Sequence, residues 1–364
     1  MLSFAMRDDS SEHRLRAGLA YSYLGLCASR SRAFAEAESL YVLAVPFLDD
    51  EGDTYRNLAV ALFQYLGHAQ SQQGRYRQSV TSYERALQLQ REASNPTAPA
   101  MSALLVETAK ACEWSRLPSR ALAYYRDVLR LEYAAASAPT EMEMYSLFRT
   151  IDLLVAMDSV GEANREVVQV AQRISKSDSS TAWHRVSLLL ASSEVLKAAG
   201  KCREAYDSAR QSVQLAASSG LEDYVQGINV LLQMSESALC AGFIDSATSI
   251  LEEAALRVRS DSLSSAIWSL RLAELSADIY SASASPLMSI KKYLALIGTS
   301  GNSAEGTSRI RGRLFAKIAE KFLLLGRADS ADRYFSLSTR EYSEYYGEDF
   351  PLVVSLRNKI STEF

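Results

Sequence analysis

A small residue recurs at every forty-second position of this chain, eight times in succession and without an insertion or deletion. These positions, which we call the small column, are Ala37, Ser79, Ala121, Ala163, Ala205, Ala247, Ser289 and Ala331. A period this strict indicates eight copies of one structural unit that stack on their neighbours. The repeat therefore constrains the fold more than any single motif does.

Two more columns indicate that each copy contains two helices. Twelve residues before the small column stand Gly25, Gly67, Ala109, Ile151, Ser193, Ser235, Ala277 and Ala319. Sixteen residues before it stand Tyr21, Phe63, Leu105, Leu147, Leu189, Leu231, Ala273 and Phe315. A spacing of four residues is helical, and a glycine five residues before the small column in four copies separates this helix from the next. Each copy is thus predicted to be a helical hairpin in which small side chains allow close contact. Ala163 and Ala205 should be buried against the first helix of their own hairpins.

Composition agrees with an all-α fold. The chain has 16 glycines and 7 prolines in 364 residues, which is roughly half the usual share of these two residues. Alanine, leucine, arginine, glutamate and glutamine, which favour helix, are abundant. A β-rich fold with many turns and a low-complexity disordered chain are both disfavoured.

The best copies resemble the tetratricopeptide repeat (TPR) family. One runs from residues 21–25 (YSYLG) to residues 35–41 (AEAESLY), and the next from residues 65–67 (YLG) through 74–76 (GRY) to 83–87 (YERAL). The usual family unit has about 34 residues, whereas the longer unit here is similar to that of kinesin light chains. Residues 347–354 (GEDFPLVV) are similar to a linker of that subgroup, with Phe350 in the place of histidine. The resemblance implies a right-handed superhelical solenoid whose first helices line the concave side.

The repeat also sets the expected boundaries. Residues 1–10 are expected to be frayed, residues 11–346 to form one solenoid of eight hairpins, and residues 347–364 to form a C-terminal capping helix that begins at Pro351. Thr140 and Glu143 form a capping box before the fourth hairpin. The seventh copy departs most from the pattern, so a bend is expected there.

Charge and cysteine usage limit the functional classes. The net charge is −4, so nucleic acid is not an expected partner, and no apolar run approaches the ~20 residues that cross a membrane. The start of the chain lacks the features of a targeting segment. The cysteines at positions 27, 112, 202 and 240 are far apart and form no CxxC motif, which favours a reducing compartment and a cytoplasmic location.

No motif in the chain points to catalysis. His13, His68 and His184 are widely separated and none has metal-ligand spacing with a cysteine. There is no GxSxG, HExxH or GxGxxG sequence. We therefore expect neither an enzyme nor a bound cofactor.

Acidic residues recur at one slot of the predicted groove, eleven residues before the small column. The slot holds Leu26, His68, Lys110, Asp152, Glu194, Glu236, Asp278 and Glu320, so five successive copies carry an acid. One interpretation is an acidic track that binds a basic segment of a partner. The other, which we favour slightly, is a solvated face partly neutralised by basic residues at helical spacing, such as Arg149 and Lys197.

The groove candidates follow from these columns. They are Gln64, His68, Lys110, Glu113, Trp114, Tyr145, Arg149, Asp152, Glu194, Lys197, Asn229, Gln233, Glu236, Arg271, Glu274, Asp278, Arg313, Lys317 and Glu320. The leading hypothesis is a non-catalytic scaffold or adaptor that binds a protein or peptide segment in this groove, without membrane insertion. A sensor or regulatory arm of a signalling system is the alternative, and an enzyme with an unrecognised site is the remote one. The oligomeric state is left open.

Overall fold

The computed structural model describes residues 11–48, 55–92, 97–134, 139–177, 180–221, 225–260, 265–283, 285–299 and 307–363. Within these ranges the chain forms seventeen helices and no strand. It divides into two compact units, Met1–Ala135 and Ala136–Phe364, here called unit 1 and unit 2.

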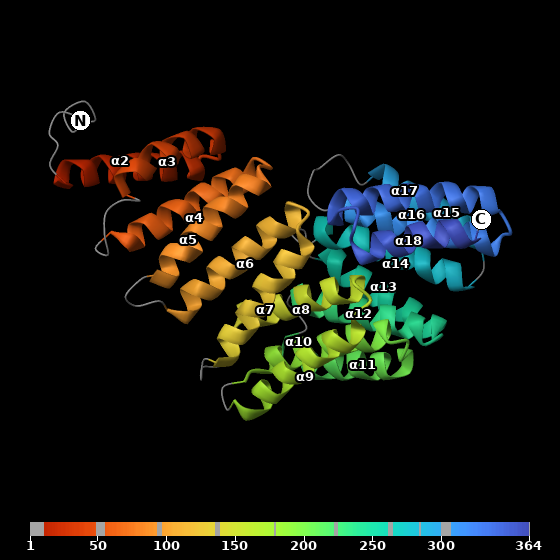
Figure 1. Ribbon diagram of the computed structural model, residues 1–364. Coiled ribbons are helices and arrows are strands. Elements are labelled where there is room, and N and C mark those ends of the chain that lie inside the picture. The colour runs from red at the N-terminus through yellow and green to blue at the C-terminus, as the bar shows by residue number, and fades with distance from the viewer. Residues whose placement is uncertain are drawn as a thin grey trace. The chain divides into compact units, whose positions relative to one another are not determined.

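Unit 1 contains three helical hairpins (Figure 1). They are α2 (Ser11–Arg30) with α3 (Phe34–Leu48), α4 (Arg56–Gln72) with α5 (Tyr76–Glu92), and α6 (Ala98–Trp114) with α7 (Pro118–Ala134). Helices α3 and α5 also pack on the first helix of the next hairpin, as expected for stacked repeats.

Unit 2 contains five hairpins and a final helix. The hairpins are α8 (Glu141–Ala156) with α9 (Val160–Lys176), α10 (Ala182–Ala198) with α11 (Cys202–Ser218), α12 (Val225–Cys240) with α13 (Ile244–Ser260), α14 (Ser265–Ser283) with α15 (Pro286–Thr299), and α16 (Thr307–Leu324) with α17 (Ala328–Tyr346). Helix α18 (Pro351–Glu363) packs on α17. There Phe350, the residue in the histidine place of the linker, is buried and stacks on Tyr346 with ring centroids 4.3 Å apart.

The small column and the column twelve residues before it are buried in every hairpin, whereas Tyr21, Leu189 and Ala273 of the third column are half-buried. All eight members of the small column are fully buried. The hydroxyl groups of Ser79, Ser193 and Ser235 each donate a hydrogen bond of 2.7–2.9 Å to a backbone carbonyl of the facing helix. The predicted burial of Ala163 and Ala205 is confirmed, and the carbonyl of Ala205 accepts the bond from Ser193 of α10. Small side chains are required here because larger ones would separate the paired helices.

The turn between paired helices depends on one left-handed residue. The four glycines predicted to reverse the chain have φ between +67° and +80°, a region that glycine enters without strain. The equivalent residues of other hairpins, Arg32, Arg116 and Asp158, have φ between +56° and +63°. The turn conformation is therefore kept in these three hairpins, which have no glycine at this position.

Some expectations lie outside the described residues. They include the frayed segment 1–10 and part of the turn in the seventh copy. The bend expected at that copy stays a prediction. The capping box at Thr140 is formed in part, since its side chain accepts from the backbone N–H of Glu143 at 3.1 Å.

Candidate functional site

The first helices of unit 2 line a cavity of about 950 Å³. Its walls come from α8, α10, α12, α14 and α16, and no second helix contributes. The lining residues are Tyr145, Phe148, Arg149, Asp152, Val155, Glu194, Lys197, Asn229, Gln233, Glu236, Leu239, Cys240, Leu270, Arg271, Glu274, Leu275, Asp278, Arg309, Ile310, Arg313 and Lys317. The hairpin architecture places them together because each first helix presents the same face as the one before it.

Thirteen of the candidates chosen from the sequence line this cavity. They are Tyr145, Arg149, Asp152, Glu194, Lys197, Asn229, Gln233, Glu236, Arg271, Glu274, Asp278, Arg313 and Lys317. Glu320, the last acid of the predicted track, is exposed and does not line it.

The other five candidates lie on α4 and α6 of unit 1. Gln64 is half-buried, and His68 is exposed with its ring edge-on to Phe34. Lys110 forms an ion pair with Glu107 at 2.8 Å. Of these five residues, Trp114 lines a surface cavity of the described part of unit 1.

Glu113 and Trp114 also have local roles in unit 1. Buried Glu113 accepts a 2.6 Å hydrogen bond from the hydroxyl of Tyr125. Trp114 packs on Tyr76, with ring centroids 5.3 Å apart, beside a surface cavity of about 470 Å³.

Four of the five acids in the predicted track line the unit 2 cavity, and every one of these is paired. Lys197 of α10 binds Glu194 at 3.2 Å and Glu236 of α12 at 2.8 Å. Arg271 of α14 binds Glu236 at 3.0 Å from the other side. Cations of the protein thus engage the four lining acids, whereas the binding of a basic segment along the track stays a prediction. The partly neutralised face, slightly favoured from the sequence, describes these residues better.

The same pattern continues between α14 and α16. Arg313 donates two hydrogen bonds to the carboxylate of Glu274, at 2.8 and 2.6 Å. Lys317 binds both Glu274 at 2.8 Å and Asp278 at 2.6 Å. A forked arginine–carboxylate pair of this kind fixes the orientation of both side chains.

A further ion pair connects the first and last hairpins of unit 2. Asp152 of α8 binds Arg149 of its own helix at 2.7 Å and Arg309 of α16 at 3.3 Å. Ion pairs therefore join α10 to α12, α12 to α14, α14 to α16, and α16 to α8. These four contacts tie the first helices of the cavity wall to one another through charge.

These pairs fix the charge states of the acids. Burial by itself would raise the pKa of Glu236, but the charges of Lys197 and Arg271 outweigh burial and hold this pKa far below its ordinary value. The pKa of Glu274 is lowered in the same way, because Lys317 and Arg313 outweigh its burial. Both carboxyl groups are ionised at neutral pH and are poor candidates for proton transfer.

One polar group of the cavity has no partner. Gln233 is 4% exposed, and its Nε2 donates no hydrogen bond among the described residues. One turn earlier on α12, the side-chain oxygen of Asn229 accepts a 2.6 Å bond from Arg271. A buried amide donor without an acceptor costs free energy until something supplies one. The Nε2 atom itself has almost no accessible surface, so this unmade hydrogen bond lies within the cavity wall.

Sequence reasoning missed two kinds of lining residue. The apolar ones include Val155 and Leu239, which stand eight residues before the small column and continue the groove stripe by one helical turn. That signal was present in the sequence. Arg309 had no such signal, because it lies near the start of α16 and meets a carboxylate 157 residues earlier in the chain.

The structure pairs two cysteines whose pairing the sequence did not predict. Cys202 and Cys240 form a disulfide with their Cα atoms 5.3 Å apart, although 38 residues separate them in the sequence. Stacking of consecutive hairpins brings them together, which wide sequence spacing does not exclude. Cys27 and Cys112 are free thiols.

Comparison with known proteins supports the fold. No protein-family model matches the chain, and no curated protein matches it. The solved structure of apo RapI is similar with a TM-score of 0.64 and 10% identity, over 98% of this chain and 89% of that one. The apo form of the quorum sensor NprR from B. thuringiensis gives a TM-score of 0.59 and 12% identity, over 90% and 87%.

A third structure extends this likeness. A Rap protein complexed with competence and sporulation factor is similar over 100% of this chain and 91% of that chain, with a TM-score of 0.55 and 10% identity. These structures are TPR-like helical solenoids. The chain has a tetratricopeptide-repeat fold. The fold class predicted from the 42-residue repeat is thereby confirmed, and the TPR hairpins of unit 2 are what place the cavity residues on first helices. No helix in the described part of this TPR chain is both long and apolar enough to cross a membrane.

Proposed function

We propose that this chain is a non-catalytic TPR scaffold that holds a peptide or protein segment in the cavity of unit 2. A volume of about 950 Å³ suits several residues of an extended chain. The eight hairpins act in this proposal as one array, with the thirteen cavity candidates as the binding surface.

The observation that carries the proposal is the lining of the cavity, in which polar and apolar side chains of five first helices lie together. A peptide main chain offers N–H and carbonyl groups at every residue, which suit the polar side chains of this lining. Apolar side chains from α8, α12 and α14 lie among the polar ones, including Phe148, Leu239 and Leu270. The lining therefore suits the mixed polar and apolar surface of a peptide.

The ion pairs bear on the charge of the partner. The lining carries six basic and five acidic side chains, and its acids are engaged by neighbouring cations. A basic segment, which the sequence suggested, would have to displace those cations. We therefore propose a partner segment without strong positive charge.

A peptide-display experiment tests this function. The full chain is screened against random linear peptides, and selected peptides are measured against Gln233→Trp, which fills the cavity, and Leu256→Trp as a control. Leu256 lies on α13, is 65% exposed and does not line the cavity. Binding should be lost in the first variant and kept in the control. Failure to enrich any peptide, or equal binding by both variants, would contradict the proposal.

A sensor is the second candidate, because two of the most similar structures are described as a quorum sensor and as a Rap protein bound to competence and sporulation factor. In that case the selected peptide should change hydrogen exchange in helices remote from the cavity. A scaffold would show protection confined to the lining helices. The scaffold proposal also includes an adaptor role and a cytoplasmic location.

A further inference from the structure

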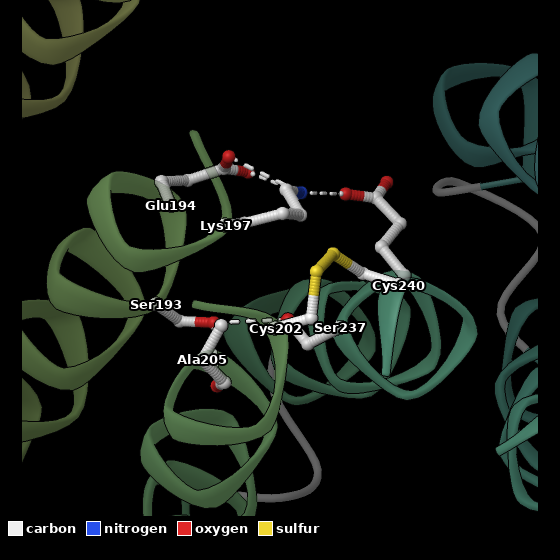
Figure 2. Close-up of a disulfide and its surroundings, with 8 residues drawn as sticks. Ser193, Glu194, Lys197, Cys202, Ala205, Ser237 and Cys240 are labelled. Atoms are coloured by element: carbon white, nitrogen blue, oxygen red, sulfur yellow. Dashed lines mark hydrogen bonds and ion pairs between the residues drawn. A yellow bond between two sulfur atoms is a disulfide. The ribbon is translucent and has the colours of Figure 1, made fainter. Parts of the chain in front are cut away.

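The disulfide of unit 2 lies on the seam between two consecutive hairpins. Cys202 is the first residue of α11, and Cys240 is the last residue of α12. Two other ties lie on the same seam. One is the Lys197–Glu236 ion pair at 2.8 Å. The other is a buried hydrogen bond of 2.9 Å between the hydroxyls of Ser193 and Ser237, which Figure 2 shows near the disulfide. The covalent bond thus acts in parallel with non-covalent contacts.

The two sulfur atoms have different surroundings. Cys240 lines the cavity, whereas Cys202 does not. Cys202 begins a helix of seventeen residues and stands between Lys201 and Arg203. A helix N-terminus and nearby cations stabilise a thiolate, and a helix C-terminus, where Cys240 stands, does the opposite. Cys202 is therefore the better leaving group, and Cys240 is the cysteine that lines the cavity.

We propose that the Cys202–Cys240 disulfide is a thiol-exchange site that opens into the cavity and regulates it. A thiolate from a low-molecular-weight thiol enters the cavity and attacks Sγ of Cys240. The S–S bond breaks, its electron pair leaves on Cys202 as a thiolate, and Cys240 carries the mixed disulfide. A second thiol attacks the outer sulfur of the adduct, which releases Cys240 as a thiol and the small molecule as its own disulfide. Two thiols are oxidised and one protein disulfide is reduced.

Exchange has two consequences for the cavity. The mixed disulfide places a new group on its wall, one turn from Glu236. Full reduction removes the covalent tie between hairpins, and the ion pair and serine contact then hold the seam. The hairpins remain folded because their buried columns do not depend on the bond. The effect on a partner rests on the proposed function, whereas the exchange itself does not.

The first test follows reduction in the folded protein. The full chain, oxidised, is treated with increasing glutathione, and thiols are counted by alkylation and mass spectrometry while helicity is followed by circular dichroism. Two thiols should appear at a rate proportional to glutathione, with helicity retained. Cys27, which is exposed, and Cys112, whose pKa is raised by burial to about 12, serve as reactive and unreactive references. Reduction only in denaturant, or four thiols in the oxidised protein, would overturn the proposal.

The second test locates the adduct and its effect. After brief exposure to glutathione and acid quenching, peptide mapping should find glutathione on Cys240 at least tenfold more often than on Cys202. The single variants should show the matching bias: Cys202 in C240S should react with iodoacetamide at least tenfold faster than Cys240 in C202S. Hydrogen exchange at the end of α12 should rise several-fold on reduction of the wild type and should not change in the double variant C202S/C240S. An adduct on Cys202, equal alkylation rates, or unchanged exchange on reduction would refute the assignment, and none of these readouts requires a partner.

Discussion

Arg309 on α16 donates a hydrogen bond to the carboxylate of Asp152 on α8, across 157 residues of sequence. Asp152 also binds Arg149 of its own helix at 2.7 Å. One carboxylate therefore serves two guanidinium groups from the first and last hairpins of unit 2. This shared contact joins the two ends of the ion-pair series around the cavity.

A double-mutant cycle on Arg309→Ala and Asp152→Asn should give a coupling free energy of about 0.5–1 kcal/mol. The magnitude is small because the side chains are 28% and 39% exposed, and it should shrink in high salt. Chemical denaturation of the four proteins measures it. Arg210→Ala, at an exposed pair with Asp207 on α11, is the control and should change stability less. Zero coupling at low salt would show that the contact does not contribute in solution.

Arg173→Ala should destabilise the protein by about 3–5 kcal/mol, because it leaves the charge of Glu143 buried without its partner. The two side chains are 7% and 1% exposed, and their charged atoms are 2.8 Å apart. Thermal or urea unfolding checks this, with Arg165→Ala as a control at a position 70% exposed on the same helix. Similar effects of the two substitutions would argue against a buried pair.

Ala205→Leu should destabilise the protein by about 1–3 kcal/mol by overpacking the contact between α10 and α11. Ala205 is fully buried, and its carbonyl accepts the hydroxyl of Ser193 at 2.9 Å. Ala198→Leu makes the same change at an exposed position of α10 and should have little effect. A melting temperature that is equal in the two variants would contradict the close packing of this hairpin.

Acid should destabilise unit 2 through Glu274. The pKa of this carboxyl is lower in the folded protein than its ordinary value of 4.5, so below about that pH the unfolded chain binds more protons than the folded one. The stability that Glu274 contributes is present above pH 4.5 and is lost as the pH falls through the folded pKa. Glu274→Gln should flatten the acid limb of a stability–pH curve, whereas Glu253→Gln, at an exposed position on α13, should leave it unchanged. An acid limb that is identical in wild type and Glu274→Gln would sink this assignment.

The 42-residue repeat predicted a large part of the cavity lining, but not all of it. The distance in sequence from the small column correctly predicted thirteen of the residues that line the cavity. It could do so because every first helix turns the same face toward the cavity. The same count placed Glu320 with them, yet this residue is exposed and lies outside the lining. The column of a residue determines the direction in which its side chain leaves the helix axis. Whether that side chain lines the cavity also depends on where the row of first helices ends.

The sequence by itself determined the hairpins, their pairing and their core. A period of 42 residues is a local property, so buried positions such as Ala37 and Tyr41 could be read from spacing alone. Tertiary structure decided which partners those helices bring together. The Lys197–Glu236 pair, the Cys202–Cys240 bond and the Asp152–Arg309 contact join residues 39, 38 and 157 positions apart. Such contacts depend on the rotation and separation of neighbouring helices and on side-chain rotamers, and a repeating pattern of residue types does not specify these quantities.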